Sequence, residues 1–188
     1  MIRTKTHRRY LLTPLRYPGG KTSLFSFFDI VIKVHNWQGV TYIEPFAGGA
    51  GAAISLLLLE KVSSIVINDY DPAIYAFWYA VTRYNTEFIR RVAQTPVTVE
   101  EWERQKLIYK AADTSDKLSL GFATFFLNRT NRSGIFDAGP IGGKQLLDLY
   151  PDSPYRAFNR LLYIFLTKPQ YHQLFVDNCK SCSKKIYV

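Results

Sequence analysis

Apolar and polar positions along the chain predict short buried strands separated by helices. Residues 40–44 and 64–69 are brief apolar runs that end in polar side chains, as buried strands do. Between them, the apolar run Ala52–Leu59 predicts a helix that ends near residue 60. Two strands joined by one helix form a βαβ unit, whose strands lie parallel. The pattern therefore predicts an α/β fold.

Further helices are expected on both sides of this unit. The pattern predicts helices over residues 22–35, 72–84 and 155–166 and through most of 85–128, with Asp71 as a cap, Pro72 at a first helical position and Thr98-Val-Glu-Glu101 as a capping box. Gly and Pro are frequent in residues 129–151, which predicts a loop or hairpin. Residues 173–177 and Lys185–Val188 are expected to be a third strand and the start of a fourth. We expect three parts: residues 1–82 carry the first half of the sheet domain, 83–170 form a helical, loop-rich insert and 171–188 return to the sheet.

A Gly-rich segment, Glu44-Pro-Phe-Ala-Gly-Gly-Ala-Gly51, lies between the first predicted strand and its helix. Doubly wound folds bind nucleotide-like ligands at such a turn, because small residues let the ligand approach the backbone. Asp69 ends the second predicted strand, about eighteen residues later, where a carboxylate can accept both hydroxyls of a ribose. A tight strand–helix connection and a helix-capping carboxylate are the alternatives.

Composition and charge narrow the class of protein. With 188 residues and 47% hydrophobic residues, the chain is long enough for one domain with a core. A net charge of +9 favours a polyanionic partner, most simply nucleic acid. No apolar run is long enough to span a membrane and no secretory signal is recognised, so we expect a cytoplasmic protein. Cys179 and Cys182 form a single C-x-x-C pair, which is insufficient for a zinc site.

Four stretches occur in an informative order: Leu15-Arg-Tyr-Pro-Gly-Gly-Lys21, the segment from Glu44 to Gly49, Ile67-Asn-Asp-Tyr-Asp-Pro72 and Phe126-Leu-Asn-Arg-Thr-Asn-Arg-Ser-Gly134. Together they resemble the Dam-type, alpha-group DNA adenine N6-methyltransferases, over nearly the whole chain. The resemblance implies an incomplete Rossmann-like methyltransferase sheet with a DNA-recognition insert. It also implies methyl transfer from S-adenosylmethionine to the amino group of a flipped adenine in double-stranded DNA, as in Dam or restriction-modification enzymes.

The resemblance implies particular cofactor residues. Lys21 is placed near the carboxylate of S-adenosylmethionine, Asp69 at the ribose and Asp177 at the adenine amine. Ala50 stands where the family has a second glycine. The implied cofactor-binding residues are Tyr17, Lys21, Glu44, Pro45, Phe46, Ala47, Gly48, Asp69 and Asp177.

The insert is implied to face DNA. Arg and Asn side chains suit guanine and adenine edges in the major groove, and Arg or Lys binds phosphate. A solvated loop is the alternative. The implied DNA-binding residues are Asn128, Arg129, Asn131, Arg132 and Lys144.

The family's Asp-Pro-Pro-Tyr motif, which holds the flipped adenine, is expected directly after a fourth strand. The segment Lys185–Val188 is the kind of strand that precedes it, and the sequence reaches Val188 without the motif. Asp71-Pro-Ala-Ile74 follows the second strand and Asp152-Ser-Pro-Tyr155 lies inside the insert, so neither is assigned as catalytic. No catalytic residue is therefore assigned.

The absent motif leads us to expect a truncated chain that is inactive alone, with a second chain supplying the absent half. No Pro-Cys occurs, which argues against cytosine ring-carbon methylation. A non-catalytic DNA-binding or regulatory remnant and an RNA amino-group methyltransferase are the alternatives.

Overall fold

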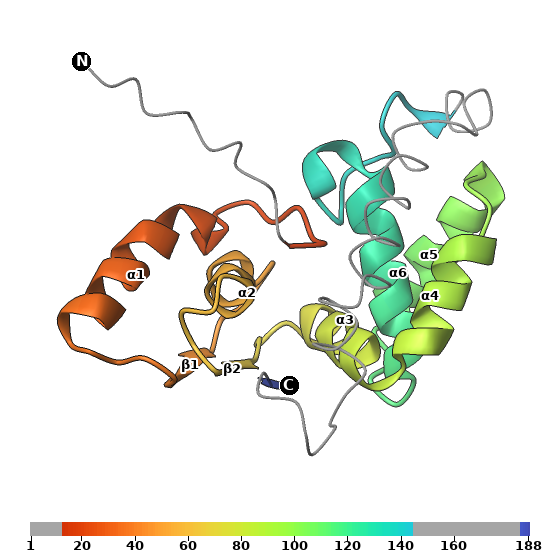
Figure 1. The fold of residues 1–188 in the computed structure, drawn as a ribbon. Helices are drawn as coiled ribbons and strands as arrows, with labels where there is room; N and C mark the ends of the chain where they lie inside the picture. Colours follow the sequence, from red (N-terminus) through yellow and green to blue (C-terminus); the bar gives the residue numbers. More distant parts are fainter. Residues whose placement is uncertain (1–12, 145–184) are drawn as a thin grey trace.

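The computed structural model describes residues 13–144 and 185–188 (Figure 1). Its helical elements are η1 (Lys21–Leu24), α1 (Phe25–Val34), α2 (Gly51–Leu58), α3 (Pro72–Arg83), α4 (Asn85–Gln94), α5 (Val99–Ala111), α6 (Lys117–Thr130) and η2 (Arg132–Gly134), and its strands are β1 (Thr41–Glu44), β2 (Ser64–Ile67) and β3 (Lys185–Tyr187). The helix predicted over residues 155–166, the strand predicted over 173–177, the Asp152–Tyr155 segment and both cysteines lie outside the described residues.

The three described strands form a parallel sheet in the order β1-β2-β3. Thr41 pairs with Ser64 and Glu44 with Ile67, while Ser64 also pairs with Lys185 on the other side of β2. Helix α2 connects β1 to β2, so the predicted βαβ unit is confirmed.

The strand predicted over Lys185–Val188 is confirmed except for its last residue. Its pairing with β2 runs from Ser64–Lys185 to Val66–Tyr187 and stops there. The prediction that Val188 belongs to the strand is wrong, because Val188 lies beyond this last pair and outside β3. Its side chain is half-buried and packs against the apolar core, which explains why it reads as part of the apolar run.

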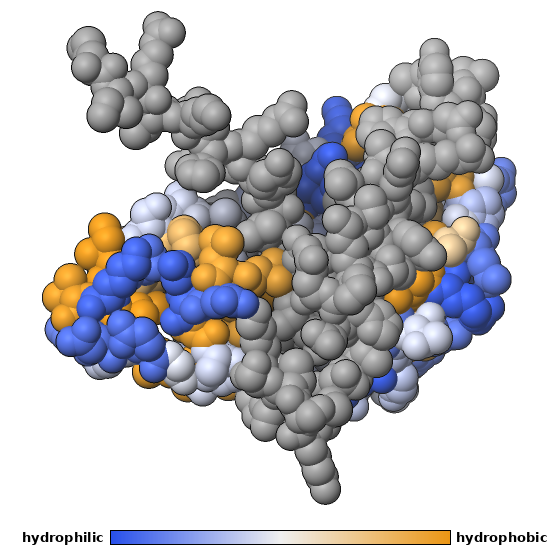
Figure 2. Space-filling model, viewed as in Figure 1, coloured by the Kyte–Doolittle hydropathy of each residue, from blue (hydrophilic) through white to orange (hydrophobic). Residues whose placement is uncertain are grey.

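Burial explains why these short runs form strands and a helix. Ile65 and Ile67 of β2 are fully buried, and α2 is buried from Gly51 to Leu57. A helix that is apolar on all sides is stable only inside a core, which accounts for the uninterrupted apolar run in the sequence. Figure 2 shows that apolar side chains also remain on the surface, on the side that carries α1. There Phe27, Ile30 and Val34 are at least half exposed, whereas Ile32 of the same helix is buried.

Local capping signals are borne out at two helix starts. The Asp71 side chain accepts a hydrogen bond from the Ala73 backbone N–H at 2.8 Å, ahead of α3. The Thr98 hydroxyl accepts one from the Glu101 N–H at 3.2 Å, ahead of α5. The Glu101 carboxylate turns away to Arg104, so only half of the predicted capping box is formed.

Helix α6 is the centre of the helical part and packs against α3, α4 and α5. Its contact with α3 is close: a Cβ at Gly121 would lie 2.9 Å from the Cα of Phe77. The aromatic rings of Phe77, Phe88 and Phe125 also meet here. The same apolar core continues to α2 and β2, so the boundary predicted after residue 82 crosses a continuous core and stays a prediction.

The Gly-rich region after α6 turns back as the pattern predicts. Asn131 forms an antiparallel bridge with Pro140, and the Ile141 N–H donates to the Thr130 carbonyl at 2.8 Å. The hairpin alternative for this loop is therefore confirmed within the described residues. Among these residues, no helix has the length and apolar character needed to cross a membrane.

Candidate cofactor site

The turn after β1 is held against the end of β2 by backbone hydrogen bonds. The Asn68 N–H donates to the Glu44 carbonyl at 3.1 Å, and the Ala47 N–H donates to the Asn68 carbonyl at 2.9 Å. Gly48 and Ala50 both adopt left-handed backbone with φ of 49°, which lets the chain reverse before α2 begins. The carboxyl ends of both strands and the N-terminus of α2 therefore meet at one edge of the sheet.

Asp69 joins the two halves of this edge. One carboxylate oxygen accepts a hydrogen bond from the Gly48 N–H at 2.7 Å, and the other accepts from the Asp71 N–H at 3.0 Å. These contacts orient the half-buried carboxylate and leave lone pairs for further donors, since each oxygen can accept more than one hydrogen bond. The structure thus brings Asp69 and the Gly-rich turn together.

Tyr17 lies against the Gly-rich turn from the other side. A Cβ at Gly48 would be only 2.7 Å from a carbon of the Tyr17 ring, and one at Gly49 would lie 3.2 Å from the Tyr17 Cβ. The Trp78 indole N–H donates to the Gly48 carbonyl at 2.8 Å, which fixes the turn further. The sequence interpretation explained these small residues by a ligand that approaches the backbone. The structure adds another requirement for them, because the chain's own N-terminal segment packs on the same turn.

Lys21 is engaged with the end of β1. Its ammonium group lies 3.1 Å from a carboxylate oxygen of Glu44 and also donates to the Phe46 carbonyl. The Glu44 side chain is 2% exposed, and its other oxygen accepts from the Ala53 N–H at 3.1 Å. Burial raises the pKa of Glu44, while Lys21 and the Ala53 N–H oppose that rise. Lys21 is therefore the main counter-charge for a buried carboxylate, and its contact with the cofactor stays a prediction.

We expect Lys21→Met to destabilise the protein more at about pH 7 than at about pH 4, the pKa range of an unperturbed Glu. The pKa of Glu44 is raised on folding, so its contribution to stability is largest below the unfolded pKa and falls as pH rises through the folded pKa. Without Lys21, the pKa of Glu44 rises further, so more stability is lost as pH rises. The expected loss at neutral pH is about 1 to 2 kcal/mol, because Lys21 is partly exposed and water screens the pair.

Urea unfolding at the two pH values measures the difference. Glu44→Gln is the matched background, since Lys21→Met added to it should show no such pH dependence. Equal losses for Lys21→Met at both pH values would contradict the ion-pair role of Lys21.

The remaining predicted residues of the turn differ in exposure. Phe46 is 68% exposed at the corner after β1, and Pro45 beside it is also exposed, whereas Ala47 is buried. The ring of Phe46 is thus available to a planar group. Asp177 lies outside the described residues.

The end of β3 supplies no candidate for the group that would hold an acceptor base. Val188 follows β3 directly, at the point where the sequence interpretation expected the Asp-Pro-Pro-Tyr motif to come next. Its side chain packs on the apolar core and has no polar atom with which to bind an amino group. No catalytic residue is assigned within the described residues, and the interpretation that the motif is absent stays a prediction.

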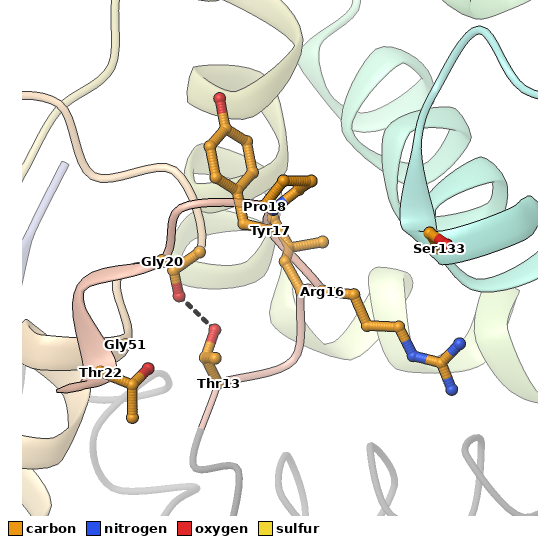
Figure 3. Close-up of a pocket in the computed structure, with 10 residues that line it drawn as sticks. Thr13, Arg16, Tyr17, Pro18, Gly20, Thr22, Gly51 and Ser133 are labelled. Atoms are coloured by element: carbon orange, nitrogen blue, oxygen red, sulfur yellow. Dashed lines mark hydrogen bonds between the residues drawn. The ribbon is translucent and has the colours of Figure 1, made fainter.

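A cavity of about 400 Å³ lies beside the Gly-rich turn (Figure 3). Gly49 and Gly51 form part of its wall, and Figure 3 shows Arg16 and Ser133 on the opposite side from Thr22. Of the predicted cofactor residues, Tyr17 contributes to the lining, whereas Glu44 and Asp69 lie outside it. Sequence reasoning missed Thr13, Thr22 and Ser133, because single hydroxyl residues in loops carry no distinctive pattern. The lining residues are Thr13, Leu15, Arg16, Tyr17, Pro18, Gly20, Thr22, Gly49, Gly51 and Ser133.

The surroundings of Tyr17 are acidic. Burial raises the pKa of Tyr17, and the carboxylates of Asp69 and Asp71 raise it further. Burial together with Asp71 and Asp137 raises the pKa of Tyr109 to about 12. Asp71, in the β2–α3 loop, therefore acts on both tyrosines, whereas Asp69 acts on Tyr17 and Asp137, in the loop after η2, acts on Tyr109. Such an environment favours a cationic group over an anionic one.

Two residues predicted to face DNA are internal contacts instead. Asn128 is fully buried: its amide oxygen accepts from the Arg16 N–H at 2.9 Å, and its amide nitrogen donates to the carbonyls of Arg16 and Gly134. Arg129 is 6% exposed and donates to the Pro14 carbonyl at 3.4 Å. Their prediction as groove-facing side chains is wrong, because they bind the backbone of the N-terminal segment.

Asn131 is likewise internal, whereas the last two predicted residues are exposed. The Asn131 side chain is fully buried and accepts from the Trp102 indole N–H at 2.7 Å, so its prediction as DNA-facing is also wrong. Arg132 and Lys144 lie on the surface, and the Lys144 ammonium is 2.5 Å from a carboxylate oxygen of Glu103. Contact of Arg132 and Lys144 with DNA stays a prediction.

Comparison with known proteins gives the family. The model of the D12 class N6 adenine-specific DNA methyltransferases matches residues 17–139, a span that begins at Tyr17 and includes the Gly-rich turn and Asp69. A search of curated proteins finds no significant match. The matched span covers more than half of the 188 residues and carries all the described elements from η1 to η2. The chain therefore belongs to the D12 class N6 adenine-specific DNA methyltransferase family.

Proposed function

We propose that this chain binds S-adenosylmethionine against the Gly-rich turn and serves methyl transfer to the N6 amino group of adenine in double-stranded DNA. The observation that carries the proposal is the Asp69 carboxylate, held by the Gly48 and Asp71 N–H groups with lone pairs to spare. A ribose offers two hydroxyl donors to such a carboxylate.

The charges around this edge fit the cofactor. S-adenosylmethionine carries a sulfonium cation, and Asp69 and Asp71 make the surroundings of Tyr17 acidic. The exposed ring of Phe46 suits contact with an adenine ring. When bound, the cofactor supplies an electrophilic methyl group. The residues named here would hold and orient it, which is chiefly a positioning effect.

We expect Asp69→Asn to weaken S-adenosylmethionine binding about 30-fold. The amide keeps the size of the side chain, but it loses the negative charge and one of the two acceptor oxygens. Isothermal titration of the purified chain with S-adenosylmethionine measures the change. Asp113→Asn is the matched control, because Asp113 contacts its own turn, through Ser115 and the Asp116 backbone, and its substitution should leave affinity unchanged.

Unchanged affinity in Asp69→Asn would contradict the ribose assignment.

Salt-dependent DNA binding by a wild-type chain that does not bind cofactor would instead support a non-catalytic DNA-binding module. An RNA substrate is tested by comparing the affinity of the chain for DNA and RNA duplexes. Because these 188 residues include no Asp-Pro-Pro-Tyr sequence, we expect cofactor binding without turnover by this chain on its own. Turnover would overturn that last expectation.

A further inference from the structure

A second cavity, of about 470 Å³, lies against α5. We name it the lysine cavity. Its lining residues are Trp102, Glu103, Lys106, Leu107, Lys110 and Lys144. It shares no lining residue with the cavity beside the Gly-rich turn.

Trp102 gives the lysine cavity a fixed floor. The indole is 5% exposed, and its N–H donates to the buried Asn131 side chain at 2.7 Å. The Lys106 ammonium lies 4.8 Å from the ring centroid and that of Lys144 lies at 5.9 Å. Cation–π attraction therefore holds two ammonium groups at this site. With so little of the ring exposed, the cavity suits a charged group rather than a stacked base.

The lysine cavity contains two lysines without a carboxylate partner among the described residues, whereas arginines on the neighbouring helix surfaces are paired. On α4, Arg90 and Arg91 both contact Glu87, and on α5 Arg104 contacts Glu101. Each of these arginines therefore has a carboxylate partner, with Arg90 and Arg91 sharing one.

Within the cavity the one carboxylate is Glu103, which pairs with Lys144. Lys106 and Lys110 have no carboxylate partner among the described residues. They lie one turn apart on α5, a spacing at which like charges repel unless an anion joins them.

We propose that the lysine cavity binds a phosphate of the DNA backbone. This proposal rests on the proposed function, in which double-stranded DNA is the substrate. The net charge of +9, the exposed Lys110 and the half-buried Lys106 favour a polyanion. Through Asn131, Trp102 is tied to the start of the loop that carries Arg132, and Lys144 ends the described part of that loop. A phosphate held here sets the position of that loop on the duplex and carries no sequence information.

The test is the salt dependence of duplex binding by the full 188-residue chain. In Lys106→Gln/Lys110→Gln, the slope of log K against log salt concentration should fall in magnitude by about 1, equally for duplexes of different sequence. The matched control is Lys33→Gln/Lys117→Gln, which removes the same charge from α1 and from the start of α6 and should keep the wild-type slope. Lys106→Arg/Lys110→Arg should also keep it.

Three outcomes would overturn the proposal: an unchanged slope in Lys106→Gln/Lys110→Gln, an equal fall in the control pair, or a fall seen with an RNA duplex and absent with DNA. S-adenosylmethionine titration of each variant shows that it is folded and reports on the proposed function separately. Any of these three outcomes together with normal cofactor binding would overturn the lysine-cavity proposal and leave the proposed function intact.

Discussion

Gly121→Val is expected to lower the free energy of unfolding by about 3 kcal/mol. Gly121 lies in the middle of α6, where a Cβ would contact the Ala76 carbonyl oxygen and lie 2.8 Å from its carbon and 2.9 Å from the Phe77 Cα. All of these atoms belong to the backbone of α3, so the clash is relieved only if the two helices separate. That separation would open the aromatic core between Phe77 and Phe125.

Urea unfolding followed by circular dichroism measures this effect. Gly121→Ala should cost less, about 2 kcal/mol, because the better helix propensity of alanine offsets part of the strain. Gly139→Ala is the control, since a Cβ there meets nothing within 4 Å. Wild-type stability in Gly121→Val would contradict the close approach of α3 and α6.

The same substitution should also weaken cofactor binding. Helix α3 carries Trp78, whose indole N–H holds the Gly48 carbonyl, and it starts next to Asp71, whose N–H holds Asp69. A displaced α3 therefore disturbs both sides of the Gly-rich turn. Titration of Gly121→Val with S-adenosylmethionine, under conditions where that variant is folded, would measure this coupling.

The second large effect is expected for Asn128→Ala, with a loss of about 3 kcal/mol in the free energy of unfolding. The Asn128 side chain makes hydrogen bonds to both the N–H and the carbonyl of Arg16 and to the Gly134 carbonyl. Its removal leaves these backbone groups without that partner in a buried position. Asn128→Asp should cost at least as much, because a carboxylate cannot donate to the two carbonyls and brings a buried charge.

Unfolding and DNA binding must be measured together for Asn128. If Asn128 read a DNA base, Asn128→Ala would leave the free energy of unfolding unchanged and reduce the affinity for DNA. The structure predicts the opposite: a lower free energy of unfolding and an unchanged affinity for DNA. Arg132→Ala is the control, since Arg132 is exposed and its loss should change the free energy of unfolding by less than about 0.5 kcal/mol. Full stability in Asn128→Ala would contradict the contacts with Arg16 and Gly134.

Elements that depend only on residues close by in the sequence could be predicted from it. The Asp71 cap, the strand at residues 64–67 and the buried helix α2 follow from rules that act within a few residues. The hairpin after α6 also follows from its glycines and prolines. The half-formed capping box at Thr98 shows the limit of such rules, because Glu101 has competing partners one turn later in Arg104 and Gln105.

The candidate site also has one part that the sequence predicted and another that it did not. The sequence by itself determined that a strand, a Gly-rich turn and a helix adjoin, and that Asp69 ends the next parallel strand. Parallel pairing then places Asp69 beside Gly48, because the carboxyl ends of adjacent parallel strands share one edge.

Only the tertiary structure decided which polar residues face inward. Asn128 and Arg16 are 112 residues apart, and nothing local indicates that one binds the backbone of the other. An Asn side chain has the same donor and acceptor groups as a peptide, so the same residue can read a base or satisfy a buried loop. Folding brought the loop's unpaired backbone groups to Asn128, and satisfying them in a buried site outweighs leaving the side chain exposed to a ligand.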